Sequence, residues 1–187
     1  EFNITQADFY QNTWWPDMQQ LAKEQNLTYT AIPIFDYRGV TEPPFLYPEW
    51  ESTTIIKDGK TVIATDELMR SVIASRHELG FHGYNHQSLL KDNWPDQEIM
   101  EIAILGAIKK WKSSGFGKLP ETYVPPSNFI DGTGIDALSI AMPSLHIMSS
   151  LYLGEFEEGS DREFDPEPFD EDMFDFPRIT SGYVIKD

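Results

Sequence analysis

Apolar residues recur along this chain at two different spacings, and each spacing predicts a different kind of element. Between residues 14 and 25 they repeat at helical intervals, which predicts a helix with one apolar face (Trp14, Trp15, Met18, Leu21 and Ala22). Residues 28–35 form a run of β-branched and aromatic residues, which predicts a buried strand. Residues 55–63 turn at Asp58-Gly59 and are typical of a β-hairpin.

The alternation of helical and extended patterns continues through the rest of the chain. Asp66 is expected to cap a helix with an apolar inner face (Leu68, Met69, Val72 and Ile73). A longer helix is expected from Pro95-Asp96 to residues 113–117, with an apolar stripe in the core (Ile99, Ile102, Ala103, Gly106 and Trp111). Further strands are expected at residues 123–124, 145–152 and 176–183. This repeated order favours an α/β fold of barrel type, as a single domain over residues 1–187.

Composition narrows the classes of partner. The formal net charge is −17 and the sequence pI is about 4.4, which argues against nucleic acid because phosphate binding depends on Lys and Arg. No stretch approaches the ~20 apolar residues of a membrane span, and the amino terminus lacks a signal-peptide pattern. The chain contains no cysteine, so we expect any bound metal to be held by His, carboxylate or water.

Much of the negative charge lies in one segment, at about residues 155–176. It contains eleven acidic residues against the single cation Arg162 (acidic positions 155, 157, 158, 161, 163, 165, 167, 170, 171, 172 and 175). Such a run predicts a solvated loop. It lacks the regular Asp-x-Asp-x-Asp-Gly spacing of a calcium loop, and its interleaved phenylalanines predict that it packs in places.

Three of the four histidines lie within residues 76–90. His82 and His86 are four positions apart, and neutral imidazole is the commonest protein ligand of divalent transition metals. A hydrogen-bonded structural pair is the alternative reading of this spacing. The apolar run 79–81 followed by Gly83 and Asn85 predicts a strand that ends in a loop, which is where α/β proteins collect their sites. His146 alternates with apolar neighbours, which favours a structural or surface role.

The histidine segment resembles the second motif of the polysaccharide deacetylase superfamily, carbohydrate esterase family four and its relatives. In that motif a Gly-His-Glu-Ile-Gly lead-in precedes His-Ser/Thr-x-x-His. Here the lead-in reads Arg-His-Glu-Leu-Gly at 76–80, and the pair reads His-Gly-Tyr-Asn-His at 82–86. Gly83 therefore replaces the usual hydroxyl residue, which places the chain among divergent members.

Other segments follow in the family's order. Residues 119–126, then Ser127 and Asn128, resemble the Arg-Pro-Pro-Tyr strand that lines one wall of the substrate groove, with Val124 in place of the Arg. Residues 94–111 resemble the helix before that wall, and 134–141 resemble the helix after it. The similarity covers about residues 12–150.

The resemblance implies a distorted (β/α) barrel that removes N-acetyl or O-acetyl groups from a sugar polymer with a bound divalent metal, zinc by expectation. The metal is held by two His and one Asp, and a second Asp acts as the base. The family's Thr-Phe-Asp-Asp motif is absent from this sequence. Since residues 14–25 resemble the family's first helix, we expect the strand that carries this Asp pair to precede Glu1.

The remaining site residues are expectations from position. Asp36 follows the strand 28–35 and is the carboxylate proposed as metal ligand and catalytic group beside His82 and His86, although turn capping or pairing with Arg38 is the alternative. Arg178 is proposed to replace the missing Arg. Tyr123 or a main-chain N–H is expected to steady the oxyanion. Pro126 is expected to line the groove and Asn128 to orient the sugar.

The sequence thus predicts a metal-dependent carbohydrate deacetylase that acts outside the cytoplasm. The first alternative is a noncatalytic carbohydrate-binding or scaffold domain of the same fold that has lost the Asp pair. The second is a glycoside hydrolase with two facing carboxylic acids. The oligomeric state does not follow from the sequence.

Overall fold

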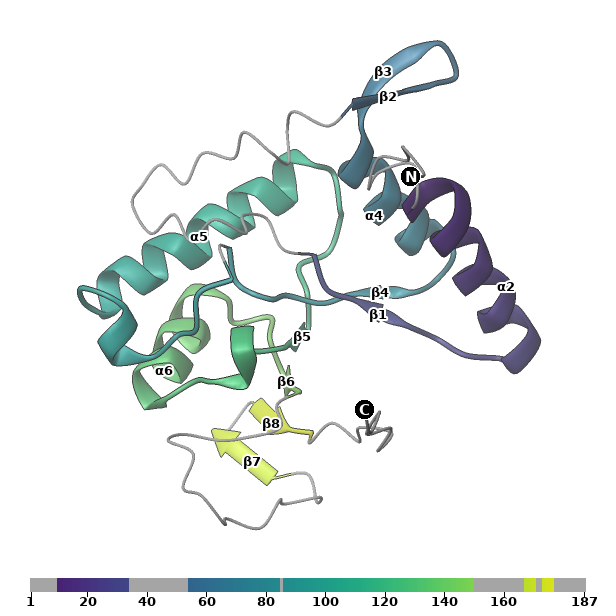
Figure 1. Ribbon diagram of the computed structural model, residues 1–187. Coiled ribbons are helices and arrows are strands. Elements are labelled where there is room, and N and C mark those ends of the chain that lie inside the picture. Colours follow the sequence, from purple (N-terminus) through teal and green to yellow (C-terminus); the bar gives the residue numbers. More distant parts are fainter. Residues whose placement is uncertain (1–9, 34–53, 85, 150–166, 171–172, 177–187) are drawn as a thin grey trace, which may run out of the picture.

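Helices and parallel strands alternate along the chain in the computed structural model, which describes residues 10–33, 54–84, 86–149, 167–170 and 173–176 (Figure 1). The elements, in chain order, are η1 (Tyr10–Trp14), α2 (Trp15–Gln25), β1 (Thr30–Ala31), β2 (Thr54–Lys57), β3 (Lys60–Ile63), α4 (Ala64–Ala74), β4 (Glu78–Leu79), η2 (Lys91–Asn93), α5 (Gln97–Ser113), β5 (Thr122–Tyr123), η3 (Pro126–Asn128), α6 (Gly132–Ala141), β6 (Ile147–Met148), β7 (Glu167–Asp170) and β8 (Met173–Asp175).

The parallel strands form one continuous ladder. β1 pairs with β4, β5 pairs with β6, and β6 pairs with β8, all in parallel. A parallel bridge between Phe81 and Tyr123 joins the two groups, since Phe81 N donates to Thr122 O at 2.7 Å and Val124 N donates to Phe81 O at 2.9 Å. β7 lies antiparallel to β8 at the edge.

Strand order distinguishes between the two common α/β architectures. The parallel strands follow one another across the sheet as β1, β4, β5, β6 and β8, which is also their order in the chain. A doubly wound sheet reverses its order at a switch point, whereas a barrel wall does not. The described strands have the order of a barrel wall but do not form a closed barrel. The α/β class is therefore confirmed, and the barrel stays a prediction.

The two faces of the sheet differ in burial. Leu79, Phe81, Tyr123 and Met148 lie on one face and are buried in the core, together with side chains of α5 and α6 such as Ile104 and Leu138. On the other face the Glu78 carboxylate accepts hydrogen bonds from the hydroxyls of Thr30 at 2.7 Å and Thr122 at 2.6 Å. Because alternate residues of an extended segment share a face, His82 lies on the same face as Glu78 and Gly80.

The predicted helices are present, with one boundary wrong. α5 begins where it was expected, and Asp96 caps it, since its Oδ1 accepts from Ile99 N at 2.9 Å. α4 begins two residues before Asp66 and has no side-chain cap, so the predicted cap at Asp66 is wrong. Asp66 is instead buried in the first turn, where the helix dipole favours a carboxylate. Leu68 and Val72 are buried as expected, whereas Ile73 is 38% exposed.

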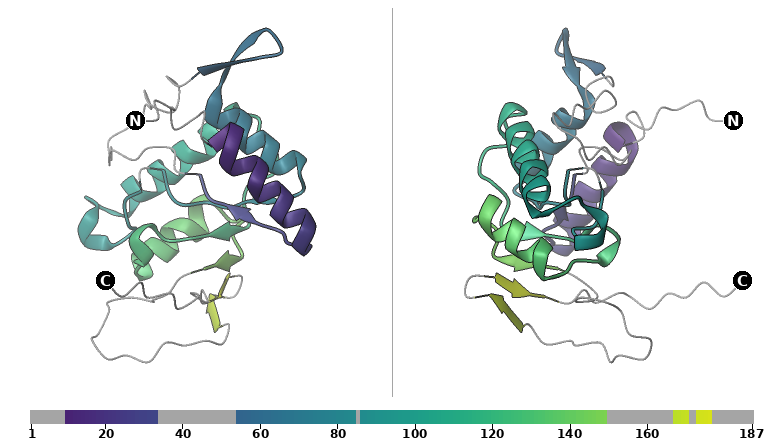
Figure 2. Two further views of the ribbon diagram at one scale, coloured as in Figure 1. Left: turned by 45° about the vertical axis from the view of Figure 1, so that its right-hand side comes forward. Right: turned by 90° about the vertical axis from the view of Figure 1, so that its left-hand side faces the viewer.

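The helices form two pairs (Figures 1 and 2). α5 packs against α6. α2 lies alongside α4, and two polar contacts join them: Trp15 Nε1 donates to Ser71 Oγ at 2.8 Å, and Gln19 Nε2 donates to Ser75 Oγ at 2.6 Å.

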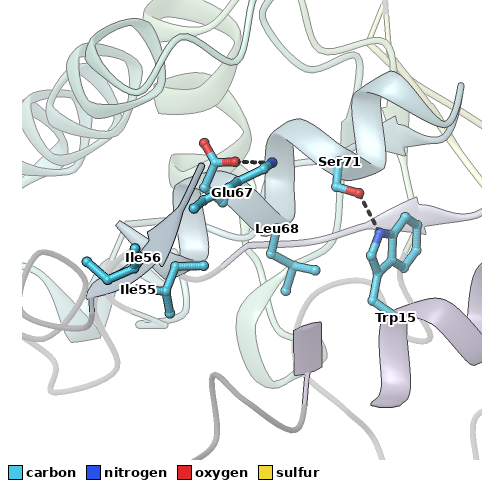
Figure 3. Close-up of a pocket in the computed structure, with 7 residues that line it drawn as sticks. Trp15, Ile55, Ile56, Glu67, Leu68 and Ser71 are labelled. Carbon is cyan, nitrogen blue, oxygen red and sulfur yellow. Dashed lines mark hydrogen bonds and ion pairs between the residues drawn. The ribbon is translucent and has the colours of Figure 1, made fainter. Parts of the chain in front are cut away.

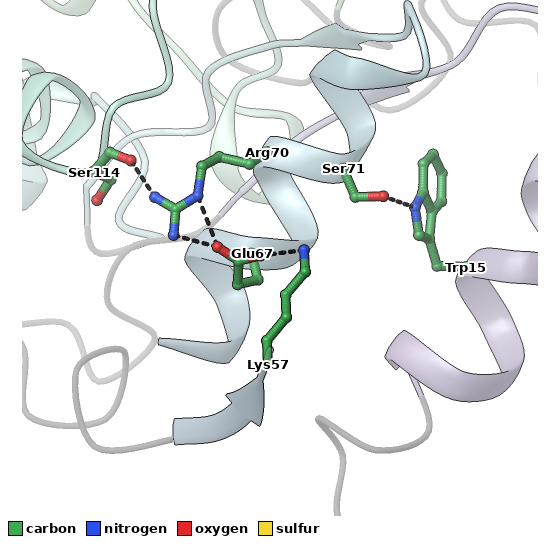
Figure 4. A network of polar contacts seen from close by, with 6 residues as sticks. All are labelled: Trp15, Lys57, Glu67, Arg70, Ser71 and Ser114. Carbon is green, nitrogen blue, oxygen red and sulfur yellow. Dashed lines mark hydrogen bonds and ion pairs between the residues drawn. The ribbon is translucent and has the colours of Figure 1, made fainter. Parts of the chain in front are cut away.

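A polar network fixes the hairpin β2–β3 to the body (Figure 4). Lys57 of β2 lies 2.5 Å from the Glu67 carboxylate of α4. Arg70 donates to the same carboxylate and, at 2.7 Å, to the main-chain oxygen of Ser114 after α5. Glu67 thus joins α4 to β2, and Arg70 joins α4 to the segment after α5, 44 residues further along the chain.

The acidic segment is not only a loop. β7 and β8 lie within it, and β8 pairs with β6 through Phe174 N to His146 O at 2.9 Å and Phe176 N to Met148 O at 2.7 Å. The apolar residues of the segment supply the strand, with Met173 buried in the core. The strand predicted at residues 176–183 lies outside the described residues beyond Phe176.

Candidate functional site

His82 lies three residues after β4 and directly after Phe81, whose bridge to Tyr123 extends the ladder toward the carboxyl ends of the parallel strands. Its Nδ1 is 2.6 Å from the main-chain oxygen of Val124, beyond the end of the neighbouring β5. A carbonyl oxygen only accepts, so Nδ1 carries the proton and the lone pair of the neutral ring is on Nε2. Metal-binding histidines are commonly held in this way, with one ring nitrogen donating to a carbonyl and the other bound to the metal.

His86 comes back to the same place through a tight loop. The ring centroids of His82 and His86 are 4.9 Å apart, with an interplanar angle of 65°. Two backbone positions make this return possible: Gly83 has φ +75° and His86 itself has φ +54°. Gly83 is suited to its conformation because it has no Cβ, which gives a physical reason for the missing hydroxyl residue at that position.

The loop after β5 has an equally unusual backbone. Ser127 has φ +54° and Asn128 has φ +66°, within the turn Pro126–Asn128. Non-glycine residues in the left-handed region cost about 1–2 kcal/mol each, and they gather at functional sites. This loop lies close to the histidine loop. A Cβ added at Gly83 would be 3.4 Å from Pro126 Cγ. Pro126 is buried and Asn128 is half-buried.

Several bonds hold the two loops together. Ser88 is buried and its hydroxyl donates to Pro126 O at 2.8 Å. Its own carbonyl oxygen accepts from Trp94 Nε1 at 2.9 Å. Asp131 caps α6 by accepting from Gly134 N at 3.0 Å and accepts from Lys91 N at 2.6 Å with its other oxygen. The loops therefore form one rigid unit.

Tyr123 occupies a different environment from the rest of the site. Its side chain is fully buried against Phe81, with ring centroids 5.6 Å apart, and its hydroxyl has no hydrogen-bond partner among the described residues. Burial raises the pKa of this phenol above its ordinary value. The hydroxyl thus lies in the core, and the proposed oxyanion role is left with the main-chain N–H groups.

Asp36 and Arg178, the two charged residues that the sequence suggested beside the histidines, lie outside the described residues. Within the described ranges, no group of three or more His, Cys, Asp and Glu side chains is arranged to hold a metal ion. The tautomer of His82 and the proximity of the His86 ring are compatible with two ligands of a metal site.

Two cavities lie away from the histidines. One, of about 240 Å³, lies between α2, α4 and the hairpin and is lined by residues such as Trp15, Ile55 and Leu68 (Figure 3). The other, of about 320 Å³, lies at the opposite end of β4 and is lined by His77, Trp111 and Phe116 among others. Of the described helices, none is both long and apolar enough to cross a bilayer.

Sequence reasoning missed Ser88 and Asp131 as parts of the site. Both act across loops separated by about forty residues, with sequence separations of 38 for Ser88 to Pro126 and 40 for Lys91 to Asp131. The one available signal was Asp131 three residues before Gly134, a helix-cap spacing.

A family model described as "Uncharacterised protein conserved in bacteria (DUF2194)" matches residues 1–187. The chain belongs to the DUF2194 family. No curated protein matches this DUF2194 chain.

The DUF2194 chain is similar in structure to a protein from Mycobacterium smegmatis that is provisionally assigned as a polysaccharide deacetylase. The TM-score is 0.51 at 16% sequence identity, and the match covers 88% of the DUF2194 chain but only 45% of the other protein. The DUF2194 chain therefore has a deacetylase-like fold and spans less than half of that neighbour's length.

Proposed function

We propose that this DUF2194 chain carries the histidine pair of a metal-dependent carbohydrate deacetylase. The observation that carries the proposal is the hydrogen bond from His82 Nδ1 to Val124 O, with the His86 ring 4.9 Å away. This bond puts the ring proton on Nδ1 and the lone pair of neutral His82 on Nε2. The deacetylase-like fold of the Mycobacterium smegmatis neighbour supports the reaction class.

Each residue has a proposed part. His82 and His86 hold the cation, probed as zinc, and Asp36 supplies the carboxylate that serves as third ligand or base. When bound, the cation supplies Lewis acidity for the acetyl carbonyl. In the reaction the oxygen of water adds to the acetyl carbon, the bond from that carbon to the sugar nitrogen or oxygen breaks, and the sugar atom takes a proton as acetate leaves.

The loop after β5, at residues 126–128, is proposed to bind the sugar. In this proposal Pro126 belongs to the wall next to the histidines, Asn128 orients the sugar, and Arg178 is the cation that replaces the missing Arg. Val124 does not reproduce that Arg, because its side chain is buried. Its main-chain oxygen, however, holds His82 whatever side chain is present. Location outside the cytoplasm stays a prediction.

The alternative function is sugar binding without turnover. The observation that favours it is the buried Val124 at the Arg position, since an uncharged, buried side chain cannot take over the charge role of that Arg.

Zinc titration and acetate release test the proposal together. The metal-free protein is titrated with zinc by calorimetry, and acetate release from acetylated glucosamine oligomers is measured with and without zinc. We expect His82→Ala to weaken zinc binding by about 100-fold or more, because it removes a ligand rather than a supporting group. His146→Ala is the matched control, since His146 is exposed and lies at the opposite ends of the strands.

The outcomes separate the candidates. Zinc binding that both variants retain equally overturns the metal site. Oligosaccharide binding without acetate release, and without any zinc effect, favours the noncatalytic alternative.

A further inference from the structure

The register of the sheet places His82 in one row with an exposed aromatic residue. Phe81 pairs with Tyr123, Tyr123 with Met148, and Met148 with Asp175. One residue further along each strand, His82, Val124, Ser149 and Phe176 therefore form the next row. The bonds from Val124 N to Phe81 O and from Phe176 N to Met148 O show that the ladder extends to this row.

Alternation places this row on the face of the sheet opposite the core of α5 and α6, where Val124 is buried but Phe176 is exposed. Phe81, Tyr123, Met148 and Met173 face the core and are at most 2% exposed. The residues between and after them point the other way. Phe174 and Phe176 lie on that other face and are 46% and 43% exposed, and Ile147 beside Phe174 is 36% exposed.

We propose that Phe176 forms a stacking platform for a sugar ring of the same polymer that is deacetylated at His82. This inference rests on the proposed function and narrows its substrate to a chain of several sugar units. A pyranose ring has one apolar face of C–H groups, and an exposed phenyl ring that is not packed into the core offers it a flat apolar surface. Phe176 is the aromatic member of the row that contains His82.

Geometry sets the length of this substrate. Three strand spacings of about 4.8 Å separate His82 from Phe176, which is roughly 14 Å. A single sugar ring does not span this distance, so only an oligosaccharide contacts both residues. Val124 and Ser149 lie between them and have small side chains, of which Val124 is buried and Ser149 is half-buried.

Charge is consistent with this occupant. With a formal net charge of −17, the protein repels polyanions, and uncharged acetylated sugars bind without that penalty. We therefore infer a neutral, acetylated polymer rather than an acidic one.

The experiment compares substitutions at two neighbouring phenylalanines with N-acetylglucosamine oligomers of two to six units, in the full chain. Binding is measured by calorimetry with and without zinc, and acetate release is measured in parallel. We expect Phe176→Leu, which keeps an apolar side chain but loses the flat ring, to weaken binding of the longest oligomer by about tenfold. Binding of the dimer should be unchanged. Phe176→Tyr keeps the ring and should restore the affinity.

Phe174→Leu is the matched control, because Phe174 has the same exposure and lies on the same face but roughly 6.6 Å outside the row. Equal oligomer affinities in Phe176→Leu and the parent chain overturn the inference. An equal loss for the dimer and the longest oligomer overturns it as well, because a remote platform acts only on long chains.

Failure of this inference and failure of the proposed function give different results. If zinc binding and acetate release depend on His82 but Phe176→Leu has no effect, the platform is wrong and the deacetylase stands. If length-dependent binding is lost in Phe176→Leu while zinc and turnover are absent, the platform stands and the metal-dependent reaction is wrong.

Discussion

Ser88 is the residue whose side chain connects the two loops of the site. Its hydroxyl is buried and donates to Pro126 O at 2.8 Å, so Ser88→Ala leaves that oxygen with only the longer bond from Phe129 N at 3.2 Å. We expect a loss of about 0.5–1.5 kcal/mol in the free energy of unfolding, measured by urea denaturation. Ser114→Ala is the control, because the Ser114 hydroxyl is also buried but has no hydrogen-bond partner within the described part of the chain. Equal losses in both variants would contradict the linking role.

Tyr123 tests whether a buried hydroxyl contributes to the chemistry. Its hydroxyl has no partner among the described side chains and main-chain groups, and burial raises its pKa, so it stays neutral. Tyr123→Phe removes a desolvated polar group. We expect the free energy of unfolding to rise by up to about 1 kcal/mol and acetate release to be unchanged. Thermal unfolding and acetate release on the same preparation check this. A large fall in turnover without a fall in stability would return the oxyanion role to the hydroxyl.

Helix α6 depends on a single glycine where it meets the histidine loop. A Cβ at Gly134 would lie 2.1 Å from Leu89 O and 2.7 Å from Leu89 Cβ, and the first of these is main chain. Gly134→Ala should therefore destabilise the fold by about 1–3 kcal/mol. Gly132→Ala, in the same helix, meets no atom within 4 Å and should be neutral or stabilising by up to about 1 kcal/mol. Urea denaturation of the two variants measures the difference, and similar midpoints would show that the helix can shift.

The Glu67 carboxylate of α4 holds the hairpin β2–β3 through its ion pair with Lys57. The hydrogen bond from Lys57 is the main cause that lowers the pKa of Glu67 below 4.5, with Arg70 adding to it. A carboxyl whose pKa is lower in the folded state contributes stability fully at neutral pH. That contribution is lost as the pH falls below 4.5 through the lowered value.

Glu67→Gln should thus reduce stability at pH 7 by about 1–2 kcal/mol and flatten its decline in acid. Unfolding midpoints across the acid range measure this. Glu121→Gln is the control, since the Lys118–Glu121 pair is exposed and should contribute little. An acid profile unchanged by Glu67→Gln would show that the hairpin is held by its apolar contacts instead.

The charge of the whole molecule should make its stability depend on salt. A formal net charge of −17 over 187 residues favours expansion through self-repulsion. Raising the salt from about 0.01 M to about 0.1 M shortens the screening length from about 30 Å to about 10 Å, so we expect higher unfolding midpoints. Sodium and potassium chloride should act alike. A fall in the midpoint with either salt would show that attractive ion pairs outweigh the repulsion.

Local patterns determined the elements themselves. The helical spacing from Trp14, the Asp58-Gly59 turn and the helix start near Pro95-Asp96 each depend on neighbours in sequence, and all three are confirmed. The cap at Asp66 was wrong because a buried carboxylate in the first turn resembles a cap in sequence. The strands in the acidic segment were missed because pairing with β6, a distant contact, outweighs the charge of the run.

The sequence by itself determined the α/β class and singled out His82 and His86, because periodicity and motif spacing are local properties. Only the tertiary structure decided how those residues are used. Strand register set His82 in one row with Phe176, the main-chain oxygen of Val124 selected its tautomer, and packing against Phe81 took the Tyr123 hydroxyl into the core. Each of these depends on contacts between residues 25 or more positions apart, for which a single sequence contains no periodic signal.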